Sequence, residues 1–206
     1  MALDLLEQAA ELNGPSATRR HRLEHLEYIT EDSIKRIAAL GVTASLQPVH
    51  ADPLLAFNWM AQLGHDHRCE RAFTWSEFRD AGCKIALGTD APTAPYEALP
   101  NLYVATNRKS ALKPDMPWPP TGEAGRMIVE GGRQVFSLQD AIVGATKGAA
   151  YSCRMEDKLG SLAKGMAADF CVLAEDPFVN GTKGWCKGQQ GVMETWVGGK
   201  RVYKRE

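Results

Sequence analysis

Helical and strand-like patterns alternate along the first ninety residues. Apolar side chains recur at helical spacing over residues 2–12, and the Asn-Gly-Pro of residues 13–15 ends that pattern. Thr30 and Thr74 open two further helices, the second within the capping-box pattern Thr-Trp-Ser-Glu. Strand-like pieces follow the basic cluster 19–22 and cover 42–48 and 84–90. This alternation predicts βα units, with a parallel sheet and right-handed crossovers.

The third strand-like piece ends in Gly-Thr-Asp, which places the carboxylate of Asp90 where the strand stops. Pro92 then prevents further pairing and turns the chain away. Barrel enzymes collect their chemistry at this end of their strands, so Asp90 is a candidate metal ligand or proton acceptor. The alternative is that Asp90 only caps the following turn. This stretch alone leaves both interpretations open.

The second half of the chain predicts helices and then a β-rich tail. Residues 96–108 and 137–150 have helical patterns, the latter capped by Ser137, and the proline-rich stretch 113–125 is irregular. In the tail, strands at 169–174 and 192–197 flank a loop at 177–191, and Gly198-Gly199 leads into a further strand. A Gly-Gly pair between two such runs indicates a hairpin. We therefore expect an α/β part over residues 1–157 and a small antiparallel part over 158–206.

Composition and net charge argue against some classes of binding partner and indicate where the protein is located. The 206 residues are 44% hydrophobic and carry a formal net charge of -1, which argues against a nucleic-acid or anionic-membrane partner. The acidic, amphipathic N-terminus is not typical of a signal peptide, and no segment approaches the roughly 20 apolar residues of a membrane span. Five scattered cysteines without a CxxC pair indicate reduced thiols, with Cys83 and Cys171 in the core. We expect a cytoplasmic protein.

Histidines are the remaining candidates for chemistry. His21 and His25 are four residues apart, so they share a face of either a helix or a strand. His50 follows the second strand-like piece. His65-Asp66-His67 resembles a metal-binding pair in its spelling, but no apolar strand precedes it, and we do not expect ligation there. A single histidine is more often a hydrogen-bonded structural residue than a ligand.

Four motifs together resemble the C-terminal portion of a metal-dependent amidohydrolase, of the subfamily called amidohydrolase family 3. The resemblance covers nearly the whole chain. The motifs are Arg22-Leu23-Glu24-His25, Gln47-Pro48-Val49-His50, Ala81-Gly82 followed by Leu87-Gly88-Thr89-Asp90-Ala91-Pro92, and Gly160-Ser161-Leu162 with Gly165 and Ala168-Asp169-Phe170. Each motif alone is a weak indication of the family, but the order and spacing of the four agree with it.

The resemblance implies a (β/α)8 barrel with an attached β-sandwich. This chain would supply the last three strands and helices of the barrel and a small antiparallel tail of the sandwich. His25 maps onto a metal ligand of the sixth strand, and Asp90 onto an aspartate of the eighth strand that binds metal and handles the proton of water. Thr89 stands where the family usually has serine. His50 is a weaker candidate, either as a third ligand or as a contact to substrate.

The family mechanism implied is metal-assisted hydrolysis of amides, ureas or cyclic C–N compounds. A divalent, zinc-type ion lowers the pKa of bound water to about 7 and polarises a carbonyl, while an acid–base group moves the proton. The family's remaining ligands, a His-x-His pair, a carboxylated lysine or glutamate and another histidine, belong to strands that precede this chain. A catalytic zinc usually has about three protein ligands, so we expect an incomplete site.

Three functional hypotheses remain open. The first is a hydrolase of carbon–nitrogen bonds whose activity needs residues from a longer product or a separate chain. The second is an inactive truncated amidohydrolase that acts as an interaction module or as one half of a split enzyme. The third is a small metal-free enzyme, against which stands the lack of a Gly-x-Ser-x-Gly elbow or phosphate loop. Three parallel strands leave open edges and an uncovered inner face. We expect these to be covered by self-association, by extra helices that pack inward, or by a partner chain.

Overall fold

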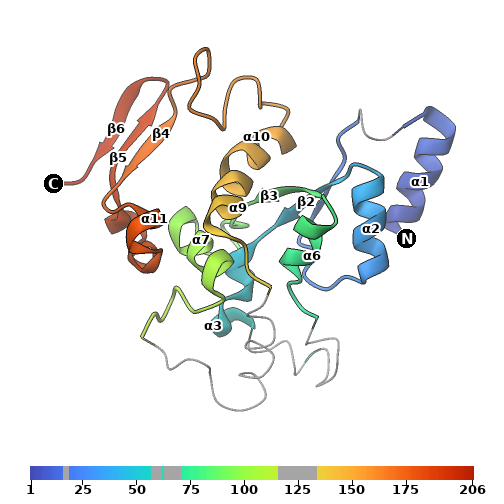
Figure 1. Cartoon of the computed structure of the whole chain (residues 1–206), viewed down its shortest axis with the longest axis horizontal. Coiled ribbons are helices and arrows are strands. Elements are labelled where there is room, and N and C mark those ends of the chain that lie inside the picture. Colours follow the sequence, from blue (N-terminus) through green and yellow to red (C-terminus); the bar gives the residue numbers. More distant parts are fainter. Residues whose placement is uncertain (16–18, 57–61, 63–70, 116–133) are drawn as a thin grey trace.

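The described residues form two small sheets, with helices around the first of them. The structure, a computed structural model, describes residues 1–15, 19–56, 62, 71–115 and 134–206. A parallel sheet lies at the centre of the molecule, and an antiparallel sheet formed by the C-terminal strands lies to one side (Figure 1). The α/β class predicted from the sequence is therefore confirmed.

The parallel sheet has the strand order β1-β2-β3, formed by β1 (Arg22–Glu24), β2 (Thr43–Leu46) and β3 (Lys84–Leu87). Helix α1 (Ala2–Asn13) precedes β1, α2 (Glu31–Ala39) connects β1 to β2, and α6 (Trp75–Asp80) precedes β3. Strand order therefore follows chain order, as the alternating pattern predicts. All three strands run in the same direction, so their carboxyl ends meet at one edge.

The core lies between the sheet and these helices. Ala44 and Leu46 of β2 point to the same face as Leu87 of β3, because side chains alternate along a strand and the register pairs Leu46 with Leu87. These apolar residues belong to one buried cluster with Ile34 of α2 and Phe78 of α6. Every residue of β2 is buried, as expected for the central strand of a covered parallel sheet.

Two of the three predicted helix caps form. Thr30 accepts a hydrogen bond from the Ser33 amide at 3.3 Å, and the side chain of Ser137 caps its helix in the same way. The predicted capping box at Thr74 is wrong. No side-chain cap forms there, and the Glu77 carboxylate accepts a hydrogen bond from Arg71 at 2.7 Å. A charge-assisted bond to arginine competes with the return contact that a capping box requires.

Short helical elements follow β2, and longer helices follow β3. Short elements η2 (Pro48–Ala51) and α3 (Pro53–Ala56) follow β2, so His50 lies in a 3-10 turn and not in the predicted loop. Helix α7 (Ala98–Asn107) lies against η2. The helix predicted over 137–150 is confirmed, but it contains a π-helical turn. Its parts are α9 (Leu138–Val143), η3 (Gly144–Gly148) and α10 (Ala149–Ser152).

The C-terminal sheet is antiparallel, with β4 (Phe170–Leu173), β5 (Val192–Val197) and β6 (Lys200–Lys204) in that order. The predicted hairpin is confirmed, because Gly198 and Gly199 have φ values of 57° and 74°, which suit a tight two-residue turn. The loop predicted at 177–191 is wrong. It contains α11 (Pro177–Asn180) and the 3-10 segment η4 (Lys183–Gly191), which is broken at Gly188.

Two features explain that error in the tail. The Asp176 side chain accepts a hydrogen bond from the Phe178 amide at 2.8 Å, and Pro177 occupies the first helical position, which together start α11. Segment η4 lies against α7, and its Trp185 is buried in the main core cluster. The many glycines and lysines around Trp185 hide this single apolar anchor in the sequence.

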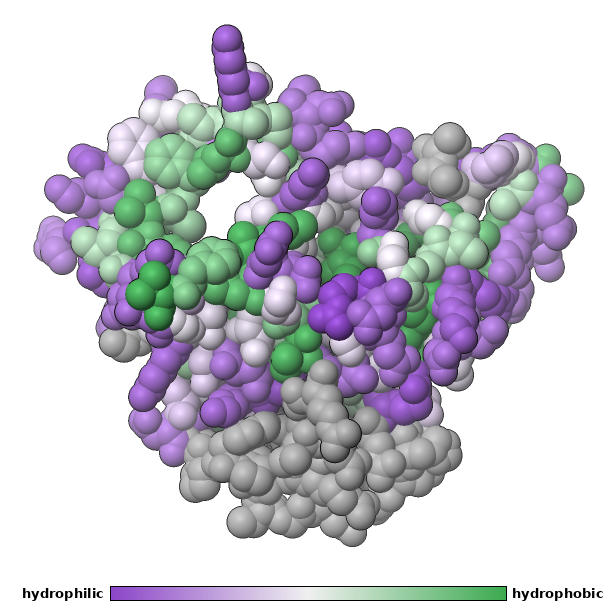
Figure 2. Space-filling view, in the orientation of Figure 1, coloured by the Kyte–Doolittle hydropathy of each residue, from purple (hydrophilic) through white to green (hydrophobic). Residues whose placement is uncertain are grey.

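The expected burial of the two cysteines is met only in part. Cys83 is half-buried, and burial raises the pKa of its thiol to about 11. Cys171 is exposed, which contradicts its predicted place in the core. Its strand belongs to the sparsely covered C-terminal sheet, and Figure 2 shows an opening between that part and the body of the molecule.

Among the residues that the structure describes, no helix has the length and apolar character needed to cross a membrane.

Candidate metal centre

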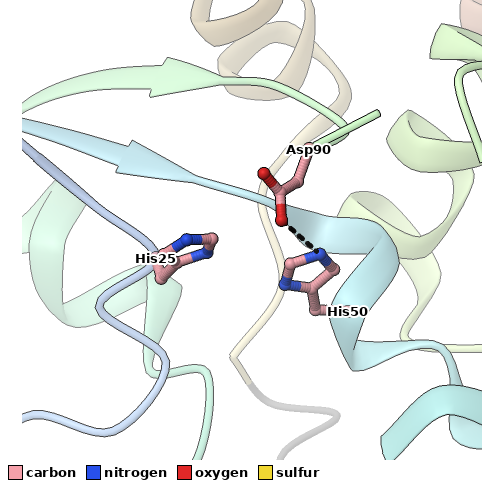
Figure 3. Close-up of side chains that lie close together, drawn as sticks. All are labelled: His25, His50 and Asp90. Carbon is pink, nitrogen blue, oxygen red and sulfur yellow. Dashed lines mark ion pairs between the residues drawn. The ribbon is translucent and has the colours of Figure 1, made fainter. Parts of the chain in front are cut away.

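The candidate site lies where the three parallel strands end. His25 follows β1 directly, His50 lies in η2 after β2, and Asp90 follows β3 by three residues. One nitrogen or oxygen atom from each of the three residues lies within 4.8 Å of the others. Figure 3 shows the two imidazole rings and the carboxylate converging from these three segments. The parallel topology produces this convergence, since residues far apart in sequence share one sheet edge.

The backbone turns sharply at two of these residues. His25 has a φ of 68° and Asp90 has a φ of 63°, both in the left-handed region that residues with a side chain seldom adopt. The carbonyl of Asp90 accepts hydrogen bonds from the amides of Thr93 and Ala94 at 2.9 and 3.2 Å, which hold the turn after β3. Such backbone conformations concentrate at functional sites, where the surrounding structure maintains them.

Glu27 controls the orientation of His50. Its carboxylate contacts Nδ1 of His50, and Nε2 of the same ring lies 3.6 Å from Oδ2 of Asp90. The hydrogen bond to Glu27 raises the pKa of His50, with smaller contributions from the charges of Glu27 and Asp90, while burial opposes the shift. With Nδ1 occupied by Glu27, Nε2 is the nitrogen that faces the space shared with Asp90.

His25 completes the cluster by stacking on the His50 ring. The two imidazole rings are stacked, with centroids 5.6 Å apart and planes inclined by 16°. Nδ1 of His25 lies 3.9 Å from the same Glu27 oxygen. His25 is exposed, whereas His50 and Asp90 are half-buried. The cluster is therefore open to solvent on the His25 side.

The donor set suits a divalent cation. Two imidazoles and one carboxylate match the ligands of catalytic zinc sites, which leave a further position open to water or substrate. The contact between Glu27 and His50 is the kind of outer interaction that fixes the tautomer of a ligating histidine. The residues present thus have the chemistry to bind a zinc-type ion.

The sequence predicts all three members of this cluster, but His50 has less support than the other two. His25 and Asp90 were expected as a pair of ligands, and His50 as a weaker candidate, yet the structure brings all three together. Glu27 was missed, because its sequence position shows only an acid two residues after His25. The motif His65-Asp66-His67 lies outside the described residues.

Asp52, which follows η2, has a structural role. Its carboxylate is fully buried and accepts hydrogen bonds from Ser110 Oγ at 2.8 Å and from the Ala111 amide at 2.7 Å. The amides of Leu54 and Leu112 also donate to it. Its oxygens are therefore occupied, and Asp52 anchors the chain after α7 to the turn that carries His50.

Comparisons with known proteins find relatives of nearly the whole chain. The chain is 30% identical over 205 residues to Protein LONG AFTER FAR-RED 3 of Arabidopsis thaliana, and 31% identical over 181 residues to the putative amidohydrolase YtcJ of Bacillus subtilis. These alignments cover 98% and 86% of this chain but only 32% and 31% of the relatives. The chain thus spans about a third of the length of the curated relatives it matches.

A solved structure shares the fold. It is an uncharacterized metal-dependent hydrolase from Pyrococcus horikoshii, with a TM-score of 0.66 at 22% identity, and the match covers 88% of this chain and 32% of that one. A family model described as "Amidohydrolase family" matches residues 1–203. Because this match includes nearly every residue, the chain belongs to the amidohydrolase family.

Proposed function

We propose that this chain carries part of the active site of a hydrolase acting on non-peptide carbon–nitrogen bonds. In this proposal, His25 and Asp90 bind a divalent metal, with His50 as the third ligand. The observation that carries the proposal is the convergence of these three donors, within 4.8 Å of one another, at the carboxyl ends of adjacent parallel strands. Zinc is the ion that such a donor set favours.

Each side chain has a distinct role in this proposal. When bound, the metal supplies Lewis acidity, which polarises a carbonyl and lowers the pKa of water to about 7. Asp90 has two carboxylate oxygens, so it can hold the ion with one and accept a proton with the other. Glu27 keeps Nδ1 of His50 engaged and so presents Nε2 to the ion. The exposed side of His25 is the side from which substrate reaches the site.

The proposed substrates are small molecules with an amide or a cyclic C–N group. Membership of the amidohydrolase family supports this class, as does the name of the Bacillus subtilis relative. Carbonyl polarisation by a metal serves both kinds of bond, because each is cleaved by addition of water to an electrophilic carbon.

We further propose that the parallel sheet is the last part of a (β/α)8 barrel. Residues 1–157 would form the end of the barrel, and residues 158–206 would contribute strands to an attached β-sandwich. Among the described strands, β1 and β3 each have one neighbour, so both outer edges are open to pairing. Further strands from a longer chain, a partner chain or a second copy would cover them.

The alternative is a catalytically inactive, truncated amidohydrolase that acts as an interaction module or as one half of a split enzyme. The uncovered surface of the C-terminal sheet favours this alternative. Val172 of β4, Val197 of β5 and Val202 of β6 are exposed, and exposed apolar side chains of this kind are available to a binding partner. In the split-enzyme form of this alternative, the metal ligands remain but turnover requires another chain.

Metal analysis of the purified chain tests the proposal. Elemental mass spectrometry should find about one zinc-type ion per chain in the wild type and none in Asp90→Ala, because the variant lacks one of three ligands. Asp80→Ala is the matched control, since Asp80 is an exposed aspartate that pairs with Arg79 away from the cluster. Equal metal content in the wild type and in Asp90→Ala would contradict the proposal.

Turnover separates the two candidate functions. The metal-loaded chain is assayed on a panel of amide and cyclic C–N compounds, with and without a chelator. Hydrolysis that the chelator abolishes, and that Asp90→Ala lacks, supports an active enzyme. Stoichiometric metal without hydrolysis indicates that turnover needs residues from a longer product or from another chain. Hydrolysis that persists in Asp90→Ala with chelator would contradict both.

A further inference from the structure

Asn101 of α7 connects the two turns that carry His50 and Asp90. Its Oδ1 accepts a hydrogen bond from the Val49 amide at 2.7 Å, and its Nδ2 donates to the Gly88 carbonyl at 3.1 Å. Val49 immediately precedes His50, and Gly88 precedes Asp90 by two residues. One side chain therefore holds the backbone of both segments just before each candidate ligand.

Burial makes these two bonds hard to replace. Asn101 is 3% exposed and the Val49 amide that it accepts from is buried, so bulk water does not already hydrate this contact. A buried amide or carbonyl that loses its partner keeps the cost of its desolvation. The turns after β2 and β3 would then shift until each group finds another partner, and the two candidate ligands would move with them.

The pairing of the strands does not provide this connection by itself. The ladder between β2 and β3 continues as far as the Gly88 amide, which donates to the Leu46 carbonyl at 3.0 Å. Beyond that point the two segments diverge, one into η2 and the other into the turn at Asp90. An amide side chain can join them because it offers a donor and an acceptor about 2 Å apart on one rigid plane.

We propose that Asn101 is a positioning residue of the metal centre, which sets the separation of His50 and Asp90 through the Val49 amide and the Gly88 carbonyl. This inference rests on the proposed function, since it assumes that the two residues bind one ion. The effect is indirect, because Asn101 touches neither candidate ligand side chain in the described structure.

Cobalt binding to the full chain tests this role, with Co²⁺ alone as the probe. The visible absorption of bound Co²⁺ reports its coordination geometry, and titration gives the dissociation constant. Asn101→Ala should bind Co²⁺ about 10-fold more weakly, the lower end of the range for losing an outer partner of a metal ligand, because Asn101 acts on the ligands only through the backbone. Its absorption bands should also change.

Asn107→Ala is the matched control. Asn107 lies on the same helix, and its amide donates to Tyr103 O at 2.9 Å and to Thr182 Oγ1 at 2.8 Å, away from the cluster. Its removal should lower the unfolding temperature without altering the Co²⁺ affinity or spectrum. If Asn101→Ala binds Co²⁺ with the wild-type affinity and spectrum, the positioning role is refuted while the metal site stands.

Hydrogen exchange separates this inference from the proposed function. A wild type that binds no Co²⁺ refutes the metal site. Exchange of the Val49 amide in the metal-free chain then decides whether Asn101 holds the turn. Faster exchange at Val49 in Asn101→Ala, but not in Asn107→Ala, supports the connection between the turns. Equal exchange in both variants refutes it.

Discussion

At the scale of single residues, Glu27 is the carboxylate that lies beside both histidines of the candidate site. Its carboxylate contacts Nδ1 of His50 and lies 3.9 Å from Nδ1 of His25. The hydrogen bond favours the protonated imidazole and raises the pKa of His50. The stabilising effect of this pair is complete below the ordinary pKa of 6.5 and is lost as the pH rises through the raised value.

We predict that Glu27→Gln lowers the pKa of His50 towards its ordinary value. Glutamine keeps an acceptor for the Nδ1 proton but removes the negative charge that favours imidazolium. The pH dependence of the imidazole resonances of the metal-free chain, followed by NMR, measures this change. The variant should also bind zinc about tenfold more weakly at a pH where His50 is neutral, because orientation by the carboxylate is lost.

Glu24→Gln serves as the control for that experiment. Glu24 is a carboxylate of the same segment that pairs with Arg22 and accepts a hydrogen bond from Gln47, and it makes no described contact with His50. The pKa of His50 should be the same in this variant as in the wild type. An unchanged pKa of His50 in Glu27→Gln would show that Glu27 does not hold the ring in solution.

The sequence indicates some residues of the candidate site but not others. Asp90 was visible because an acid directly after a short apolar run marks a strand end, and His25 because its motif resembles a known family. Glu27 has no such signal. Its role comes from its contact with His50, which lies 23 residues further along the chain. Only the pairing of β1 with β2 brings these two residues together.

At the scale of elements, the π-helical turn η3 packs closely against β3. A Cβ atom placed on Gly148 would lie 2.0 Å from the carbonyl oxygen of Ile85, and one on Gly144 would lie 2.9 Å from Cγ of Leu87. Both glycines therefore permit the helix to approach the strand. Gly144 and Gly148 are four residues apart, so both lie on the face of the helix that meets β3.

We predict that Gly148→Ala destabilises the chain by about 1 to 3 kcal/mol, the range typical of overpacking in a close contact. Alanine normally stabilises a helix relative to glycine by roughly 1 kcal/mol, so the sign of the change distinguishes the clash from intrinsic propensity. The free energy of unfolding, measured by urea denaturation, is the appropriate quantity.

Gly184→Ala is the comparison for that substitution. The nearest atom to its added Cβ would be a carboxylate oxygen of Glu175 at 3.4 Å, the end of a flexible side chain. This variant should be near neutral in the same denaturation experiment. A Gly148→Ala protein as stable as the wild type would mean that η3 lies farther from β3 in solution.

At the scale of the whole molecule, the described parallel sheet has two open edges. A strand edge presents unpaired amides and carbonyls, and the outer edges of β1 and β3 have no described strand beside them. The exposed valines of the C-terminal sheet add apolar surface. Both features favour association with other strands.

We predict that the isolated chain self-associates at micromolar concentrations. Light scattering coupled to size-exclusion chromatography should give a mass above the 22.5 kDa of one chain, because pairing of open edges and burial of apolar residues both favour the assembly. A folded, monodisperse monomer over the whole concentration range would contradict this prediction. Circular dichroism establishes that the sample is folded.

The sequence by itself determined the order and type of most elements, since periodicity and caps such as Thr30 act within a few residues. It also indicated His25 and Asp90 as candidates. Tertiary structure alone decided the rest. It placed His50 within 4.8 Å of both residues, aligned Glu27 with His50, and let buried Asn101 join two turns. These contacts depend on strand register and helix packing, which arise from the folding of the whole chain.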